Sequence, residues 1–167
     1  GHTITEVFPG LVQLKLYGSF FQQIQGVKLV GTAEILHENK SIAKDRGDIL
    51  FANYGVSGPP ILQISRKAGD LLSKSNETIL KLNIVDTMKL IDIKQLLLRR
   101  FKDRPQKPVD FSLVGFVNKR LIPVLLKEAG FTDLKVCAGN ISSQEIDKIA
   151  SILTDWRFKV RGTKSWP

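Results

Sequence analysis

Residues Gly47–Ser65, GDILFANYGVSGPPILQIS, decide how the rest of the chain is interpreted. Ile49–Phe51 is an apolar run typical of a strand, and Gly55 interrupts it. The adjacent prolines Pro59 and Pro60 suit the first turn of a helix, where a missing backbone N–H costs nothing. Ser57 is predicted to be the N-cap, because its hydroxyl can accept a hydrogen bond from a helical amide. The stretch therefore predicts a strand, a tight turn and a helix N-terminus.

The backbone amides of such a helix start are a general site for an anion or an electron-rich group, although most helix N-termini bind only water. Residue chemistry alone leaves both readings open, a capped helix without a ligand and a ligand-facing turn.

The residues before this stretch predict further strands. Leu11–Tyr17 alternates apolar and polar positions, and Val27–His37 with Ser41–Phe51 predicts a hairpin bent or bulged at Gly47. Phe20–Gln25 fits one helical turn, ended by Gly26.

The residues after it predict mostly helices, with a strand at each end. Ser142 and Glu145 have the spacing of a capping box, and Pro123 fits near the start of its helix. Strands are expected at residues 78–85 and 156–161. Helices are expected at residues 59–73, 89–102 (capped by Asp86 or Thr87), 110–117 and 119–129, and from the Ser142 capping box to near Asp155.

This order of elements predicts an α+β fold. We expect a small antiparallel, Greek-key-like β-barrel or curved sheet, closed by the first and last strands, with an inserted helical lobe. The barrel part should comprise about residues 1–86 and 156–167, and the lobe about residues 87–155. The termini should then lie close together, as in a domain inserted into another domain. Because the sequence also lacks an initiating methionine, we expect an excised insert of a larger protein.

Composition narrows the class of protein. With 43% hydrophobic and 25% charged residues, the chain is globular in type, and its apolar runs fall short of the ~20 residues that span a bilayer. The single cysteine, Cys137, excludes an internal disulfide and a cysteine-based zinc site, and its apolar neighbours predict that it is buried. A cytoplasmic location is the expectation that follows.

The formal charge of +9 raises nucleic acid as a partner. The densest basic run consists of Lys94, Arg99, Arg100, Lys102, Arg104 and Lys107. It falls at a predicted helix end, where cations oppose the helix dipole, and no aromatic residue is interleaved except Phe101, which is expected in the core. We therefore expect a solvated basic helix end, and neither nucleic acid nor a membrane as a partner.

Catalytic constellations are absent from the sequence. There is no GxGxxG or GxxxxGK[ST] motif, and His2 and His37, the only histidines, do not have the spacing of a metal site. Ser57 lies in GVSGP without a histidine that could be its base. We expect no catalytic residue and no metal site, so the chain alone should be inactive.

The motifs GDILF, YGVSGP and ILQIS, with GHTIT near the start and Gly162-Thr163 near the end, resemble the BaiN/YhiN-type flavoproteins, a family of FAD-dependent oxidoreductases. In that family a barrel and a helical lobe interrupt a dinucleotide-binding domain that holds the FAD. The resemblance implies that this chain is the insert or cap domain, which covers the flavin and shapes the pocket of an unknown small-molecule substrate. It implies FAD in the intact protein, none bound to this fragment, and the FAD-binding domain of the parent chain as partner.

The resemblance also implies which residues face the flavin or the substrate: Asn53, Tyr54, Gly55, Ser57, Gly58 and Pro59. Ala52 and Asn53 stand where the family commonly has Thr and His, and Gln13 stands where it commonly has Pro. Asn53 can supply a hydrogen bond but cannot exchange a proton near neutral pH. The alternative functions are a basic β-barrel that binds nucleic acid and a structural or oligomerisation domain.

Overall fold

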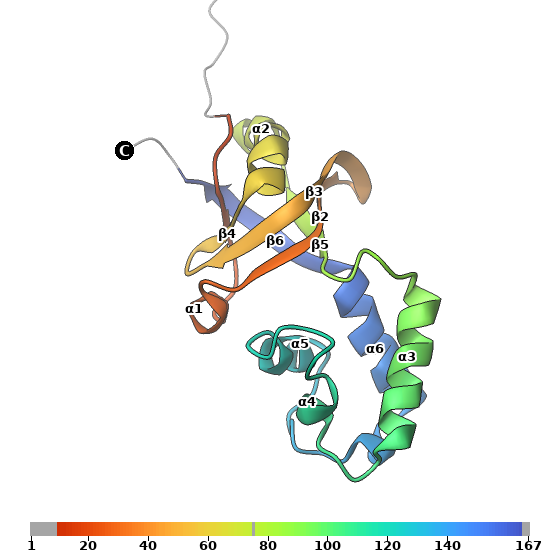
Figure 1. Cartoon of the computed structure of the whole chain (residues 1–167). Helices are drawn as coiled ribbons and strands as arrows, with labels where there is room; N and C mark the ends of the chain where they lie inside the picture. The colour runs from red at the N-terminus through yellow and green to blue at the C-terminus, as the bar shows by residue number, and fades with distance from the viewer. Residues whose placement is uncertain (1–9, 75, 165–167) are drawn as a thin grey trace, which may run out of the picture. The chain divides into compact units, whose positions relative to one another are not determined.

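The computed structural model describes residues 10–74 and 76–164. Its strands form one closed barrel in the order β1-β4-β3-β2-β5-β6 (Figure 1). The bounds are β1 Leu14–Leu16, β2 Lys28–His37, β3 Lys40–Ala52, β4 Gly55–Ser57, β5 Ile79–Asn83 and β6 Trp156–Thr163. The helices are α1 Phe21–Ile24, α2 Pro59–Ser73, α3 Leu90–Asp103, α4 Val109–Ser112, α5 Ile122–Glu128 and α6 Ser143–Thr154, with a 3₁₀ turn, η1, at Ala138–Asn140.

Pairing between the first and last strands closes the barrel. In this antiparallel pair Leu14 lies opposite Thr163 and Leu16 opposite Val160. The backbone amide of Lys164 then donates to the carbonyl of Gln13 at 2.9 Å, so both ends of the described chain lie together. The α+β class and the closure by first and last strands are confirmed.

The hairpin β2–β3 turns at Glu38 and Asn39, whose φ angles of 49° and 61° suit a tight turn. The bulge expected at Gly47 is wrong, because Gly47 pairs with Gly31 in unbroken register. The register shifts instead beside the turn, near Ile35. Gly47 has another role: a Cβ atom there would lie 3.2 Å from Cδ of Pro60, so glycine lets the start of α2 approach β3.

Alternation of side chains along the strands fills the barrel. In β6, Phe158 and Val160 are buried, whereas Arg157, Lys159 and Arg161 are exposed, as their sequence pattern predicts. The ring of Phe158 packs 5.7 Å from the ring of Phe21, which α1 places inside the barrel.

Contacts divide the chain into two compact units. The barrel unit comprises the described residues up to Lys81 and from Arg157 onward, and the helical unit comprises Leu82–Trp156. None of the helices in the described part of the chain has the length and hydrophobicity needed to cross a bilayer.

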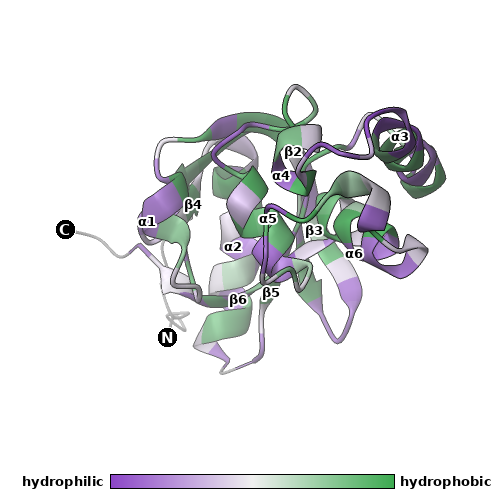
Figure 2. Ribbon diagram, turned by 90° about the horizontal axis from the view of Figure 1, so that it is seen from below, coloured by the Kyte–Doolittle hydropathy of each residue, from purple (hydrophilic) through white to green (hydrophobic). Residues whose placement is uncertain are grey.

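The helical unit packs the apolar sides of its helices around a core that includes Ile93, Leu97, Phe101, Val109, Leu113, Leu125, Leu126, Ile146, Ile149 and Leu153. Figure 2 shows both hydrophobic and hydrophilic positions on α3, as expected of an amphipathic helix. The capping box of α6 is confirmed, because Ser142 and Glu145 bond each other's backbone amides. The cap predicted for α3 is wrong: Lys89 occupies the N-cap position without a side-chain hydrogen bond, because the helix begins later than its apolar pattern suggested.

Candidate functional site

The predicted site residues lie along β4 and at its two ends. Asn53 and Tyr54 form the turn between β3 and β4, and the carbonyl of Tyr54 accepts from the amide of Leu16 at 2.9 Å. Gly55 begins β4 and Ser57 ends it. Every one of these residues belongs to the barrel unit.

Ser57 does not cap α2, which corrects the prediction. It pairs with Leu50 as the last residue of β4, and Gly58 is the N-cap, with a φ of 109° and no side-chain hydrogen bond. A run of three residues, GVS, is too short to be recognised as a strand from its pattern. Tertiary pairing with β1 and β3 forms it.

The start of α2 offers few amides to a ligand. Pro59 and Pro60 have no N–H, and the amide of Leu62 donates to the carbonyl of Gly58 at 3.0 Å. Ile61, which follows the prolines, is completely buried. The helix start is therefore a poorer anion site than its sequence suggests. Pro59 instead presents an exposed apolar side chain.

Two glycines allow β4 to pack tightly. A Cβ atom at Gly58 would lie 2.1 Å from the carbonyl oxygen of Asp48, and one at Gly55 would lie 2.3 Å from that of Leu14. No side chain fits at either distance, so the YGVSGP motif is required by backbone approach within the barrel.

Tyr54 is the centre of a polar cluster that includes two residues not predicted as site residues. Its hydroxyl donates to Oε1 of Gln13, and the ammonium of Lys164 lies 4.6 Å from the centroid of its ring. Burial raises the pKa of the Tyr54 phenol above its ordinary value. In the sequence Gln13 stands out only as a departure from the family pattern. No local signal marks Lys164, because its partner is more than a hundred residues away in the sequence.

The predicted residues do not converge on one point. The Asn53–Tyr54 turn and the Gly58–Pro59 corner lie at opposite ends of β4, which at ~3.3 Å per residue places them about 10 Å apart or more. Asn53 is exposed and Tyr54 half-buried. Together these residues offer an amide, a phenol and backbone edges along one strand, and they do not enclose a cavity.

The remaining residues singled out in the sequence lie outside β4. Phe101 is buried as expected, whereas Cys137 is exposed, contrary to the prediction, because it lies in an irregular segment just before η1. Nδ1 of His37 lies 3.3 Å from the backbone carbonyl oxygen of Glu77, and His2 falls outside the described residues. Within residues 10–74 and 76–164, His, Cys, Asp and Glu side chains form no group of three that could hold a metal.

The chain matches a family model and two relatives among known proteins. The family model described as "HI0933-like protein barrel and H2TH domain" matches residues 8–167. The chain is 30% identical over 127 residues to a 3-dehydro-bile acid delta(4,6)-reductase of Clostridium scindens, covering 76% of the chain and 31% of that protein. It is 24% identical over 160 residues to a ribosomal RNA dihydrouridine synthase of Escherichia coli, covering 94% and 36%. The chain thus spans about a third of the length of these relatives.

Proposed function

The chain belongs to the HI0933-like family, of which it is the barrel and H2TH domain, and from this premise we propose that it forms one wall of the substrate pocket in a flavin-dependent oxidoreductase. Membership confirms the resemblance to BaiN/YhiN-type flavoproteins, a family of FAD-dependent oxidoreductases. The matched relatives are about three times as long as this chain. We therefore propose FAD, the FAD-binding domain and the substrate for the intact protein rather than for this chain alone.

One observation supports this proposal: the Tyr54 side chain contacts both Gln13, just before β1, and Lys164, just after β6. Its hydroxyl bonds Gln13, and the backbone of Gln13 bonds Lys164. We propose that the FAD-binding domain of the intact protein adjoins these two points. We therefore expect the Asn53–Tyr54 turn to face that domain.

The residues of this turn suit binding and orientation more than proton transfer. A bound flavin would supply the redox chemistry. Asn53 can donate and accept hydrogen bonds without exchanging a proton. The Tyr54 phenol, with its raised pKa, donates to Gln13 and keeps oxygen lone pairs for a donor on the ligand. We therefore propose that both side chains orient the flavin edge or the substrate and exclude water.

The absorption spectrum of the flavin in the intact parent protein tests this role. Asn53→Ala and Tyr54→Phe should each shift the flavin bands or the flavin fluorescence. Lys67→Ala, on the exposed side of α2, is the matched control and should leave the spectrum unchanged. The isolated 167-residue chain should be colourless and redox-inert.

Two results would contradict the proposal. Spectra and substrate KM that are unchanged in both variants would remove the turn from the flavin and substrate pocket. An isolated chain that carries bound flavin through purification would show that it is a complete binding domain rather than one wall.

A second candidate function is RNA binding, with RNA as the substrate class of the intact enzyme. The relative named ribosomal RNA dihydrouridine synthase and the charge of +9 support it. The observation that favours it is an exposed aromatic ring, that of Phe111, beside the basic end of α3. Titration with labelled RNA at two salt concentrations tests it, because phosphate contacts predict a steep loss of affinity with salt.

A further inference from the structure

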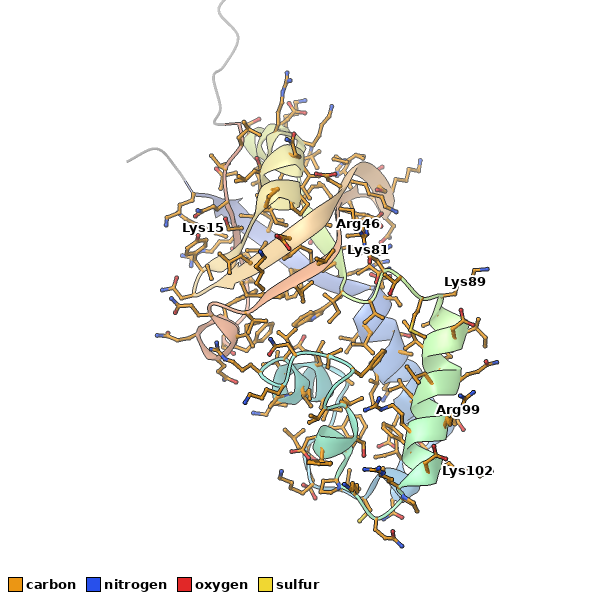
Figure 3. All side chains as sticks on the ribbon, viewed as in Figure 1. Lys15, Arg46, Lys81, Lys89, Arg99 and Lys102 are labelled. Carbon is orange, nitrogen blue, oxygen red and sulfur yellow. The ribbon has the colours of Figure 1, made fainter. Side chains whose placement is uncertain are left out.

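The basic end of α3 borders a surface hollow within the helical unit. The hollow has a volume of about 390 Å³ and is lined by Arg100, Asp103, Arg104, Lys107, Phe111, Ser112 and Val114. Three of these lining side chains are cationic, those of Arg100, Arg104 and Lys107, and one is anionic, that of Asp103. Two further cations, Arg99 and Lys102, lie on α3 outside the hollow (Figure 3). The hollow therefore favours an anionic ligand.

An aromatic ring stands at this hollow, contrary to the sequence expectation that none accompanies the basic run. The side chain of Phe111, from α4, is 52% exposed, although phenylalanine is usually buried. The ammonium of Lys107 lies 4.3 Å from its ring centroid. Charge and an open aromatic surface occur together, which is the combination that single-stranded nucleic acid requires.

Arg100 fixes this ring relative to the cations. Its guanidinium donates from Nε to the carbonyl of Ser112 at 3.0 Å and from a terminal nitrogen to the carbonyl of Val114 at 2.8 Å. These two bonds tie the end of α4 to α3. Arg100 is therefore a positioning residue, and its positive charge still faces the hollow.

A second hollow, of about 150 Å³, shares Phe111 and Val114 with the first. Lys119 and Lys135 also line it. Lys135 pairs with Asp110 at 2.6 Å, so Lys119 is the cation there whose charge is less compensated. Phe111 thus lines two hollows that each carry basic side chains.

We propose that this surface, hollow and ring together, binds single-stranded RNA, an inference that rests on the RNA candidate above. In this proposal one RNA base stacks on the ring of Phe111. Arg104 and Lys107 contact phosphates on one side of that base, and Lys119 contacts a phosphate on its other side. An acidic peptide would use the charges but has no need of an exposed aromatic ring that lines both hollows. A duplex keeps its bases stacked internally and cannot cover the ring.

Fluorescence anisotropy with a labelled oligouridine of about 12 nucleotides tests the site on the full 167-residue chain, because single-strand sites cover roughly 4–16 nucleotides. Phe111→Ala should weaken binding about tenfold with an unchanged salt dependence, and Phe111→Tyr should retain it. Arg104→Ala with Lys107→Ala should reduce the slope of log affinity against log salt by about 1.4. Circular dichroism checks that each variant is folded.

The matched control removes the same charge elsewhere in the helical unit. Lys127→Ala with Lys148→Ala, at exposed positions of α5 and α6, should change affinity far less. Equal losses in both double variants would overturn the site and show non-specific charge attraction. An unlabelled duplex that competes as well as the single strand would overturn stacking on Phe111.

The failure of this site can be distinguished from the failure of the broader proposals. If the chain binds no RNA, the RNA candidate and the site both fall, while the flavin spectra of the intact protein test the pocket wall independently. If it binds RNA but Phe111→Ala and the Arg104/Lys107 variant bind normally, only the site falls.

Discussion

The ammonium nitrogen of Lys81 lies 3.3 Å from Oε1 of Glu34, which joins β5 to β2 across the barrel wall. The side chain of Glu34 is only 11% exposed. Burial raises its pKa, but hydrogen bonds from Ser41 and Lys81 and the charges of Lys81 and Lys44 more than offset that effect, so the pKa of Glu34 lies below its usual value. The pair therefore ties β2 to β5, the strand along which the chain enters the helical unit.

Glu34→Gln is expected to lower the free energy of unfolding at neutral pH by about 1–2 kcal/mol, because Lys81 loses its anionic partner. Since the folded pKa is lowered, the contribution of Glu34 is present above the usual carboxylate pKa and is lost as the pH falls through the folded value. Urea unfolding of both proteins across this range should therefore show the difference shrink in acid. Glu77→Gln, which removes an exposed ion pair with Lys159, should have little effect.

Gly58→Ala should destabilise the barrel strongly, by about 2–4 kcal/mol, because the new Cβ meets the Asp48 carbonyl and the φ of 109° disfavours alanine. Gly26→Ala is the matched control: its φ is also positive, at 82°, but open space surrounds the position. It should cost only about 1 kcal/mol. Thermal or urea unfolding measures both, and equal losses would show that close approach at Gly58 does not matter.

Tyr54→Phe should lower the free energy of unfolding by about 1 kcal/mol, since the Gln13 amide loses its donor. Burial raises the pKa of Tyr54, so its contribution is complete below the ordinary phenol pKa and is lost as the pH rises through the folded value. Ultraviolet titration of phenolate measures this directly, because Tyr17 is the only other tyrosine and the variant isolates it. A Tyr54 signal at or below the usual phenol pKa would contradict the geometry.

Arg100→Met should loosen α4, because the carbonyls of Ser112 and Val114 lose their donors while the apolar stem of the side chain is kept. We expect a loss of about 1–2 kcal/mol in unfolding free energy and faster amide hydrogen exchange in residues 109–114. Arg99→Met, one position earlier on the exposed side of α3, should change neither. Unchanged exchange in the Arg100 variant would show that the two bonds do not hold α4.

The sequence predicted most of the fold because its local signals agree with one another. Alternation placed Phe158 and Val160 inside the barrel, Ser142 and Glu145 began α6, and Gly130 ended α5 with a φ of 94°. The sequence-based predictions were wrong where a local pattern is short or is compatible with two kinds of secondary structure. Ser57 could cap a helix or end a strand, and only the strands beside it decide which.

By itself the sequence determined the class of fold, the strands that close it and the family, because periodicity, caps and motif residues are local properties of the chain. Only the tertiary structure decided which distant side chains meet. It brought Gln13 and Lys164 to Tyr54, Lys81 to Glu34, and Phe111 to the basic end of α3. Such contacts depend on strand register and helix packing, which no single stretch of residues encodes.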